Sequence, residues 1–476
     1  MSIVAQSSLS DKGAQSGSGK DRLAAQQALR ETICAQIRPA VEAVFEQALE
    51  SEVTGFLGRP KGRHRSRLHP NVSVLRCAVC GRGQTLDFVR KGYYDRTQLT
   101  LWGAVDISVP RVECACGHCP SLPFTTLTPY DRLWSDLTEL TLTLVALDVS
   151  LRSCGAVVRL PSGYTVSIGT VQRRVQRVGV LADWSMKQKL TQSPAVVMLD
   201  GIWGTLMVET GEKKRDKKNR LRRVKHGVKV PLLIAQSIDP VSGETTLLAW
   251  VEGKRENVED WARLLTALHE RGVSAATGLR LLIIDGCGAL DTALDTVDFG
   301  PVRRQRCIFH KLENVLRDVS GGQGMTREER KARVRAVVDE ASAIYDAVTA
   351  AEARTRAAAF CSHWGVTEPK AVATLQRDFD ATLTYYAVQE EAAAQGQAWN
   401  VLHLRTTSAL EGLNRRLRAK WRQACAFWSP AGWTGALWLV AQRRQRQGKD
   451  DRPGWLEPIM CALLQPNQVE PNFPTP

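Results

Sequence analysis

The sequence predicts a multidomain α/β protein, and three observations lead to this fold class. The chain has 476 residues, enough for roughly two to four domains of ordinary size. Apolar residues make up 43% of the chain, so a sizeable core can be buried. From residue 194 onward, short apolar runs typical of buried strands alternate with amphipathic helical patterns, and residues 325–400 are rich in alanine without any strand signal.

The N-terminal part predicts an arm followed by helix. Residues 1–20 are rich in Ser, Gly and Gln and contain no hydrophobic segment, which favours a disordered arm over a signal peptide. Apolar residues recur at four-residue spacing from Leu29 to Val53, so helix is expected, with a kink or a break at Pro39. The basic segment 61–67 is either a solvated loop or an arm that contacts phosphates.

Two cysteine clusters flank a short β-prone region. A C-x-x-C pair on each side of a small β region is the spacing of a zinc ribbon, in which each pair offers two thiolates to one tetrahedral ion. Cys114 or His118 could replace a member of the second pair, and free thiols packed in a small core are the alternative. The predicted zinc ligands are Cys77, Cys80, Cys116 and Cys119.

A helix-turn-helix is predicted after the cysteine-rich region. Leucines from Leu133 to Leu147 form one helical stripe, and a Gly-containing break precedes a second, basic helix that begins near Ser167. A basic amphipathic helix that never touches DNA is the alternative. The DNA contacts predicted on the second helix are Arg173, Arg174 and Arg177.

Two predicted strands end in the same way, as Leu-Asp200-Gly and Ile-Asp285-Gly. Side chains at strand ends of an open α/β sheet face the crevice where ligands bind. The following glycine allows a sharp turn and leaves room for a bulky partner. Either aspartate alone is explained by a turn or a helix cap, but two in matching contexts favour a shared site.

Glu411 is the third candidate acid. It lies in the first turns of an amphipathic helix whose stripe contains Leu410, Leu413 and Leu417. A surface ion pair with Arg415 is the alternative role. If Glu411 joins Asp200 and Asp285, three carboxylates suit Mg²⁺ or Mn²⁺, and two ions about 3.5–4 Å apart can activate a hydroxyl and stabilise a leaving oxygen on a phosphate.

Four motifs together resemble the Mutator-type (MULE-like) transposases of bacterial insertion sequences. They are Leu199-Asp200-Gly201-Ile202-Trp203, Ile284-Asp285-Gly286, the segment Gln305 to Asn314 that contains Cys307 and His310, and the segment Thr406 to Arg418. The resemblance covers roughly residues 130–430. It implies an RNase H-like catalytic core with an all-α insertion, a catalytic and metal-binding triad of Asp200, Asp285 and Glu411, and two divalent ions.

The resemblance also implies the partners. These are the terminal inverted repeats of the element, target DNA, and a homodimer or larger assembly that brings two ends together. A net charge of +15 fits a polyanionic partner. The alternatives are a nuclease of the same core that does not join strands, and a non-catalytic DNA-binding repressor. Further DNA contacts are expected from His310, Arg415, Arg416 and Arg418.

The expected organisation follows from these assignments. No apolar run reaches the roughly 20 residues that span a bilayer, so a cytoplasmic, nucleoid-associated protein without membrane contact is expected. The predicted parts are an arm (1–20), a helical region with a basic linker (21–70), a zinc-ribbon-like region (71–130), a helix-turn-helix region (131–190), the first part of the core (194–320), the all-α insertion (321–400), the C-terminal part of the core (401–450) and a tail (451–476).

Overall fold

A computed structural model describes residues 19–62, 75–320, 324–427, 429–447 and 454–464. The predicted arm up to residue 18, the basic segment 63–67 and the last part of the tail lie outside these residues. The chain forms two compact units: Met1–Thr141 with Gly155–Val166, and Leu142–Cys154 with Ser167–Pro476. Among the described helices, none combines the length and apolar character needed to cross a membrane.

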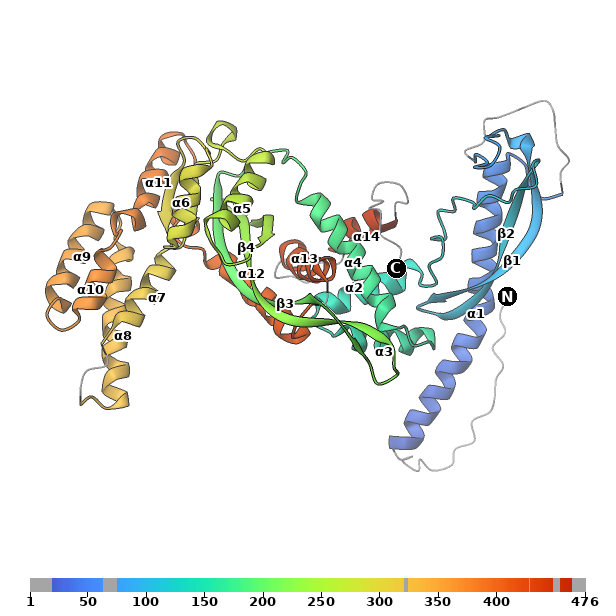
Figure 1. Cartoon of the computed structure of the whole chain (residues 1–476), viewed down its shortest axis with the longest axis horizontal. Coiled ribbons are helices and arrows are strands. Elements are labelled where there is room, and N and C mark those ends of the chain that lie inside the picture. The colour runs from blue at the N-terminus through green and yellow to red at the C-terminus, as the bar shows by residue number, and fades with distance from the viewer. Residues whose placement is uncertain (1–18, 63–74, 321–323, 428, 448–453, 465–476) are drawn as a thin grey trace, which may run out of the picture. The chain divides into compact units, whose positions relative to one another are not determined.

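The first unit is a long helix packed on a β-hairpin (Figure 1). Helix α1 (Gly19–Leu57) continues through Pro39 as one helix, so the expected break into two helices is absent within the described residues. Its buried side chains all lie in the C-terminal half, from Phe45 to Leu57, where it packs on the hairpin of β1 (Phe88–Thr100) and β2 (Gly103–Cys114). Carboxylates of α1 accept hydrogen bonds from β2, as Glu46 does from the Ser108 N–H at 3.1 Å.

The second unit contains a five-stranded mixed sheet in the order β5-β4-β3-β6-β7 (Figure 1). Strands β3, β4 and β5 are antiparallel, whereas β6 is parallel to β3 and β7 is parallel to β6. The α/β pattern predicted from residue 194 onward is therefore confirmed. The strands are β3 (Val196–Arg215), β4 (Leu221–Ile238), β5 (Thr245–Glu252), β6 (Leu281–Ile284) and β7 (Arg303–Arg306).

The alternation of side chains along β3 separates a core face from a site face. Val197 and Leu199 pack in a buried cluster with Trp261 of α5 (Val258–Glu270) and Leu290 of α6 (Gly288–Thr296). Because successive side chains of a strand point to opposite faces, Asp200 points to the other face. That face receives α12 (Ser408–Ala424), which packs on β3.

The segment between β7 and α12 is helical, as predicted, and has no strand among its described residues. It begins with α7 (Ile308–Asp318), and Thr326 and Glu329 form a reciprocal capping box at the start of α8. The helices that follow are α8 (Arg327–Ala343), α9 (Ala350–Trp364), α10 (Pro369–Gln376) and α11 (Thr384–Ala394), and short 3₁₀ turns lie at Ile344–Asp346, Asp380–Thr382 and Val401–His403.

Helices α4 and α13 of the second unit approach each other closely at two glycines. The predicted basic helix is α4 (Ile168–Ser185), which Ser167 caps as expected. A Cβ on Gly179 would lie 2.1 Å from the Ala431 carbonyl oxygen, and a Cβ on Gly435 of α13 (Pro430–Gln447) would lie 1.8 Å from a carbonyl oxygen of α4. Only glycine fits this crossing. The remaining helices are α2 (Ser135–Ala146), α3 (Leu151–Ser162) and α14 (Glu457–Leu464).

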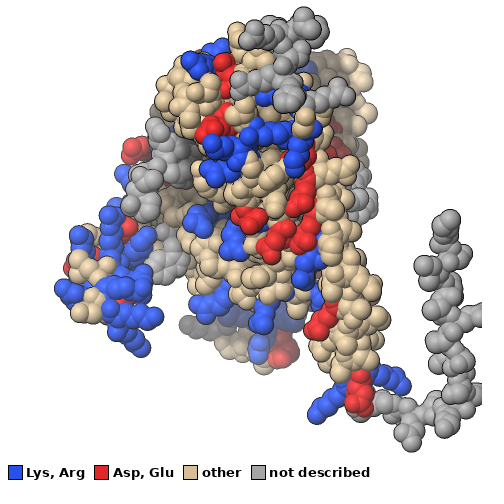
Figure 2. Space-filling view, turned by 90° about the vertical axis from the view of Figure 1, so that its right-hand side faces the viewer, with Lys and Arg blue, Asp and Glu red and all other residues tan. Residues whose placement is uncertain are grey.

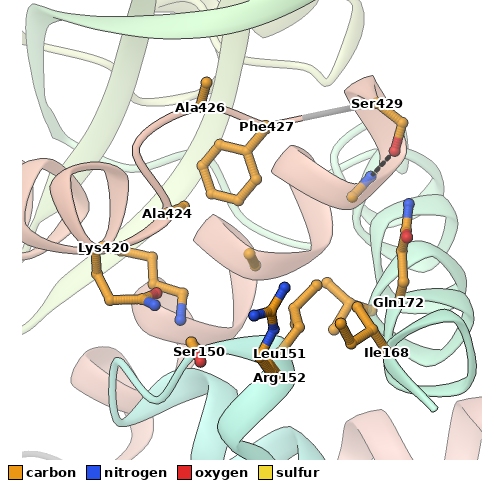
Figure 3. Close-up of a pocket in the computed structure, with 14 residues that line it drawn as sticks. Ser150, Leu151, Arg152, Ile168, Gln172, Lys420, Ala424, Ala426, Phe427 and Ser429 are labelled. Atoms are coloured by element: carbon orange, nitrogen blue, oxygen red, sulfur yellow. Dashed lines mark hydrogen bonds between the residues drawn. The ribbon is translucent and has the colours of Figure 1, made fainter. Parts of the chain in front are cut away.

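A pocket of about 480 Å³ lies where α4, α12 and α13 meet (Figure 3). Its wall includes Phe427, Gln172 and Lys420, and the buried Lys420 ammonium donates to the Val145 carbonyl at 2.7 Å. Lys420 is nine residues beyond Glu411, which is two and a half helical turns. The pocket therefore opens on the face of α12 opposite Glu411 and is separate from the acidic site.

One glycine determines how α12 sits on β3. A Cβ on Gly204 would lie 1.7 Å from the Trp421 ring, and the Trp421 indole N–H donates to the Thr205 carbonyl at 2.9 Å. Trp421 is buried at 3% exposure. The indole ring therefore occupies the space that a side chain at position 204 would fill, and Gly204 makes this contact possible.

We predict that Gly204→Ala lowers the free energy of unfolding by about 1–3 kcal/mol, because an overpacked core must shift backbone or side chains. Urea unfolding of the full chain measures this. Gly288→Ala is the matched control, since a Cβ there meets nothing within 4 Å, and it should unfold within about 0.5 kcal/mol of the wild type. Equal stability of the two variants would contradict the packing role of Gly204.

Candidate active site

The register of the sheet places Asp200 and Asp285 side by side. Met198 of β3 pairs with Ile283 of β6, and the two strands are parallel. Continuing this register by two residues brings Asp200 opposite Asp285, on strands about 4.8 Å apart. Two aspartates that are 85 positions apart in the sequence therefore occupy equivalent register positions on neighbouring strands. Asp285 directly follows the end of β6, whereas β3 continues past Asp200 to Arg215, so the strand end predicted at Asp200 is corrected.

Asp200 is buried and held by two hydrogen bonds. The residue is only 5% exposed to solvent. Oδ1 accepts from the Gly201 N–H at 2.8 Å, and Oδ2 accepts from the Asn414 side-chain amide of α12 at 2.6 Å. Asn414 lies three residues after Glu411, so both side chains are on one face of α12. The bond to Asn414 fixes that face of α12 towards Asp200.

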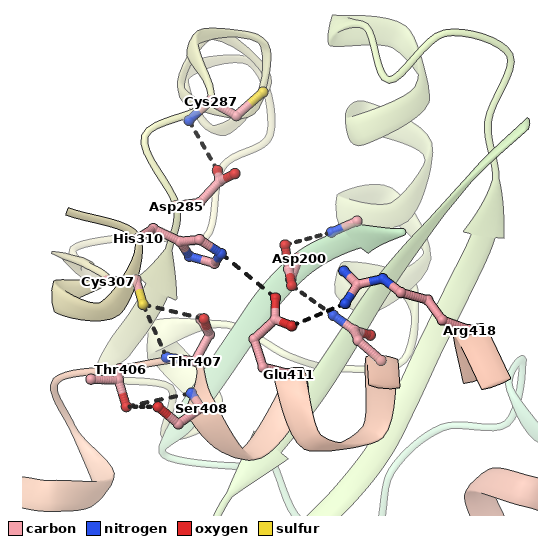
Figure 4. A network of polar contacts seen from close by, with 12 residues as sticks. Asp200, Asp285, Cys287, Cys307, His310, Thr406, Thr407, Ser408, Glu411 and Arg418 are labelled. Atoms are coloured by element: carbon pink, nitrogen blue, oxygen red, sulfur yellow. Dashed lines mark hydrogen bonds and ion pairs between the residues drawn. The ribbon is translucent and has the colours of Figure 1, made fainter. Parts of the chain in front are cut away.

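Glu411 meets Asp200 from α12, with cations on both sides (Figure 4). The side-chain ligand atoms of Asp200, His310 and Glu411 all lie within 4.8 Å of one another. His310 Nε2 is 3.6 Å from Glu411 Oε1, and Arg418 Nη1 is 3.3 Å from Glu411 Oε2. Residues from β3, α7 and α12 therefore form one compact cluster.

Hydrogen bonds that involve Cys307 and Ile308 connect the start of α7 to the start of α12. The Thr407 N–H donates to the Cys307 sulfur at 3.3 Å, and the Thr407 hydroxyl lies 3.2 Å from the same sulfur (Figure 4). The Ile308 N–H donates to the Arg405 carbonyl at 3.1 Å. These bonds bring together two stretches that are about a hundred residues apart, and they place His310 beside Glu411.

The carboxylates of this cluster have strongly shifted proton affinities. Burial, followed by the neighbouring Glu411, raises the pKa of Asp200 to about 8. The hydrogen bond from His310 lowers the pKa of Glu411 to about 2. Burial alone would lower the pKa of His310, but Cys307 and Glu411 outweigh it and raise this pKa to about 11. A buried Asp200 beside the partly buried Glu411 forms a site suited to added positive charge, in addition to His310 and Arg418.

Asp285 lies at the edge of the cluster. Its Oδ1 accepts from the Cys287 N–H at 2.9 Å (Figure 4), and it is not among the three residues whose ligand atoms lie within 4.8 Å of one another. The main chain of Asp285 is fixed, because its carbonyl accepts from Arg306 at 2.7 Å. The Asp285 carboxylate is thus bonded to the Cys287 N–H and not to Asp200.

A fourth carboxylate, which the sequence patterns did not single out, borders this site. Glu256 accepts from the Trp203 indole at 2.9 Å, and its Oε1 would lie 3.0 Å from a Cβ at Gly201. Burial, together with the charge of Asp285, raises the pKa of Glu256. Its φ of 57° is in the left-handed region, rare for a glutamate. Asn414 and Glu256 are polar contacts that only the tertiary structure reveals.

The residues predicted to contact DNA differ in their solvent exposure and in their contacts. Arg173 and Arg177 on α4 and Arg415 and Arg416 on α12 are exposed. Arg174 is instead buried at 6% exposure and donates to the Thr170 carbonyl, so the expectation for Arg174 is corrected: it stabilises the α4 backbone. His310 and Arg418 contact Glu411.

Four cysteines of the first unit form a compact thiol cluster, with one change from the predicted set. The sulfurs of Cys77, Cys80, Cys114 and Cys116 lie within 4.8 Å of one another, and Cys119 is not a member. Cys114 thus takes the place predicted for Cys119. Gly81 and Gly117 follow the two pairs with φ of 71° and 87°, so each pair is followed by the same left-handed turn.

Basic side chains are prominent on one face of the molecule. On the face drawn in Figure 2, lysine and arginine cover more area than aspartate and glutamate. This agrees with the formal net charge of +15.

Comparison with known families establishes the class of protein: a family model described as "Transposase, Mutator family" matches residues 16–447, so the protein is a transposase. Since this match spans most of the 476 residues, the chain belongs to the Mutator family of transposases. The family resemblance drawn from the four motifs is confirmed.

Curated relatives agree with this assignment. The transposase of insertion sequence ISRM5 from Rhizobium meliloti is 22% identical over 384 residues, covering 81% of each chain. The transposase of IS905 from Lactococcus lactis is 22% identical over 390 residues, covering 82% of this chain and 84% of the relative. The structure of the Drosophila P element transposase strand transfer complex matches 66% of this chain and 93% of its own, at 10% identity and a TM-score of 0.36, which is too low to define a shared fold.

We predict that the Asn414–Asp200 hydrogen bond contributes about 1–3 kcal/mol, because loss of the amide leaves a buried carboxylate oxygen without a donor. Asn414→Ala, Asp200→Ala and the double variant form a double-mutant cycle that urea unfolding can measure. A coupling energy of at least about 1 kcal/mol is expected. A coupling near zero would show that α12 is held on β3 by Trp421 and not by this bond.

Proposed function

We propose that this transposase cuts and joins DNA strands at the ends of an insertion sequence, using divalent metal ions held by Asp200, Asp285 and Glu411. One observation carries the proposal: the strand register makes Asp200 and Asp285 neighbours, and α12 brings Glu411 to Asp200. The third acid comes from a segment more than a hundred residues further along the chain. If these acids only formed turns, helix caps or surface ion pairs, there would be no reason for them to lie close together.

The sheet supports an RNase H-like core. The family resemblance implies such a core, and the second unit has a five-stranded mixed sheet with the first acid on its central strand. A helical segment between β7 and the helix that carries Glu411 matches the insertion that the resemblance implies.

The chemistry of the donor set fits hard divalent ions. Carboxylate oxygens are the protein ligands that Mg²⁺ takes, together with waters and substrate phosphates. Asp200 is buried beside a second carboxylate, and its pKa is raised to about 8 because burial and Glu411 disfavour its charge. Bound ions would supply the positive charge that activates a water or a 3′-hydroxyl and stabilises the leaving oxygen on phosphorus.

The other residues of the site position these carboxylates. Asn414 fixes the Oδ2 of Asp200, and Arg418 holds one oxygen of Glu411. His310 is placed by the Cys307–Thr407 contacts to hold the other oxygen of Glu411. We infer that His310 positions Glu411 and that this, not contact with DNA phosphate, is its main role.

Exposed arginines of the second unit would bind DNA. Arg415 and Arg416 lie on the same helix as Glu411, and Arg173 and Arg177 lie on α4. We propose that the α4 region recognises the terminal inverted repeats. Joining two ends to target DNA requires two active sites, so we also propose a homodimer or a larger assembly on DNA. A nuclease of the same core would hydrolyse these ends without joining them.

We further propose that the thiol cluster binds one structural zinc ion. The Cys77 and Cys116 sulfurs are 3.6 Å apart, as are those of Cys80 and Cys114. A tetrahedral zinc site with Zn–S bonds of 2.3 Å requires sulfurs about 3.8 Å apart. The cluster packs on the C-terminal half of α1 through the buried Cys77 and Cys114, so metal binding would stabilise the first unit.

Asp200→Asn and Glu411→Gln are each expected to reduce Mg²⁺-dependent cleavage and joining of terminal-repeat DNA by at least about a thousandfold, which corresponds to about 4 kcal/mol of barrier. Both variants should still bind the repeat in a gel-shift assay. Glu390→Gln changes an exposed carboxylate of α11 and is the matched control, with activity within about twofold of the wild type. Cleavage at the wild-type rate by either acid variant would overturn the triad. Cleavage without joining by the wild type would favour the nuclease.

For the zinc site, Cys114→Ser is expected to bring bound zinc below half an equivalent per chain, because three thiolates hold the ion more weakly than four. Cys119→Ser is the matched control and should retain about one equivalent. Elemental analysis of the purified chains measures both. The reverse result, with zinc lost from Cys119→Ser and kept by Cys114→Ser, would restore the ligand set predicted from the sequence.

A further inference from the structure

Strands β3 and β4 continue beyond the sheet as a two-stranded ribbon (Figure 1). β6 pairs with β3 only at residues 196–198, and β5 pairs with β4 only at residues 232–238. Phe427 exchanges backbone hydrogen bonds with Thr205 and Met207. Further out, within the described residues, no other strand pairs with residues 208–226. We call these residues the basic ribbon.

The charge of the basic ribbon opposes its own folding. It contains nine lysines and arginines and three acids, a net charge of 9 − 3 = +6. Lys213 lies directly opposite Arg223, and Lys214 lies directly opposite Arg222. Like charges in directly opposed positions destabilise a β ladder. These opposed lysines and arginines therefore do not stabilise the ribbon. Binding to a polyanionic partner would explain why they are present.

Asp216 organises the tip of the basic ribbon. It accepts from the Arg222 side chain at 2.8 Å, from the Arg220 side chain at 3.0 Å and from the Lys218 N–H at 2.9 Å. These bonds, that from Arg222 first, hold the pKa of Asp216 well below its usual range. Asn219 takes the left-handed φ of 59° that closes the turn. The tip is thus a defined turn that projects its lysines.

Four lysines of the ribbon remain available to a partner. They are exposed, and among the described residues no carboxylate forms an ion pair with any of them: Lys213, Lys214, Lys217 and Lys218. Two of the ribbon's three acids, Glu209 and Asp216, pair instead with its arginines and with Lys225.

The basic side chains point to both faces of the ribbon. Neighbouring positions of a strand alternate between faces, so the pair of Lys213 and Arg223 lies on one face and the pair of Lys214 and Arg222 on the other. A flat anionic surface, such as a membrane leaflet, would neutralise one face only. A groove of duplex DNA has a phosphate wall on each side. The major groove, about 12 Å wide, admits a two-stranded ribbon, whereas the minor groove, about 6 Å wide, does not.

We propose that the basic ribbon lies in the major groove of duplex DNA, about one helical turn from the phosphate that is cut. This inference rests on the proposed function for the location of the cut. Lys213 is 13 residues beyond Asp200 on β3, a path of about 43 Å at roughly 3.3 Å per residue. At about 3.4 Å per base pair, that is at most about 13 base pairs.

A four-lysine variant tests the proposal: Lys213→Gln, Lys214→Gln, Lys217→Gln and Lys218→Gln. The matched control removes four exposed charges of α8: Arg327→Gln, Arg330→Gln, Lys331→Gln and Arg335→Gln. On a duplex with at least 20 base pairs beyond the cut, the ribbon variant should bind at least about tenfold more weakly, and the slope of log K against log salt should fall by about 3. The control should bind within about twofold of the wild type. Equal losses in both variants would overturn the proposal.

Dimethyl sulfate interference with the wild-type full chain identifies the groove. The reagent methylates guanine N7 in the major groove and adenine N3 in the minor groove. Interference by guanine N7 about one turn from the cut, absent with the ribbon variant, is the expected result. Interference confined to adenine N3 at those positions, or no change with the variant, would overturn the major-groove assignment.

Substrate length separates this proposal from the proposed function. A duplex that ends about six base pairs beyond the cut cannot reach the ribbon, so wild type and ribbon variant should cut it equally. A wild type that cuts neither duplex would contradict the proposed function, while the binding and interference data would still test the ribbon. A ribbon variant with reduced cutting of the short duplex would show a role near the acids and would overturn the proposed spacing. Circular dichroism and urea unfolding confirm that the variant is folded, and removal of opposed like charges should not lower its stability.

Discussion

The seating of α12 on β3 is the interaction on which the acidic site depends. Gly204 leaves room for the Trp421 ring, and the Asn414 amide binds the Asp200 carboxylate from the same helix. Two contacts along one helix fix its position and its rotation together. Glu411 reaches Asp200 because α12 cannot slide or turn without breaking one of them. The register of β6 beside β3 places the backbone of Asp285 next to that of Asp200, at the edge of this cluster.

Much of this could be predicted from the sequence, and the parts that could not have identifiable physical causes. The apolar run ending at Ile284 predicted a strand end before Asp285 correctly, because strand burial and turn chemistry are local properties. The strand end predicted at Asp200 is wrong, since β3 continues to Arg215 by pairing with β4, a contact that the local pattern does not show. Cys119 was preferred over Cys114 because spacing alone was counted, whereas the left-handed glycine after each pair, Gly81 and Gly117, identifies the turns. Arg174 could not be recognised as buried, because the helix period does not tell which neighbour covers a face. Asn414 and Glu256 gain their roles only from contacts between distant segments.

The thiol cluster and the acidic site depend on their surroundings in different ways. The thiols lie in a small hydrophobic cluster with Phe88 and Leu57, where a bound ion would substitute for a larger core. The acids lie on the face of the sheet opposite its main core, where burial raises the pKa of Asp200 and its charge requires compensation. With zinc bound as proposed, the first region would use a metal ion to stabilise its fold, whereas the second uses its fold to hold Asp200 and Glu411 close together.

The glycine-to-glycine crossing of α4 and α13 has a consequence for accuracy. Gly179 and Gly435 let the two backbones touch, and α13 in turn packs on α12. The helix proposed to read bases, α4, and the helix that carries Glu411, α12, are thereby joined through direct packing on α13. Bases recognised by α4 would stand at an invariant spacing from the phosphate at Glu411. The protein would then cut at a fixed distance from the bases that it recognises, and each copy of the element would end at the same nucleotide.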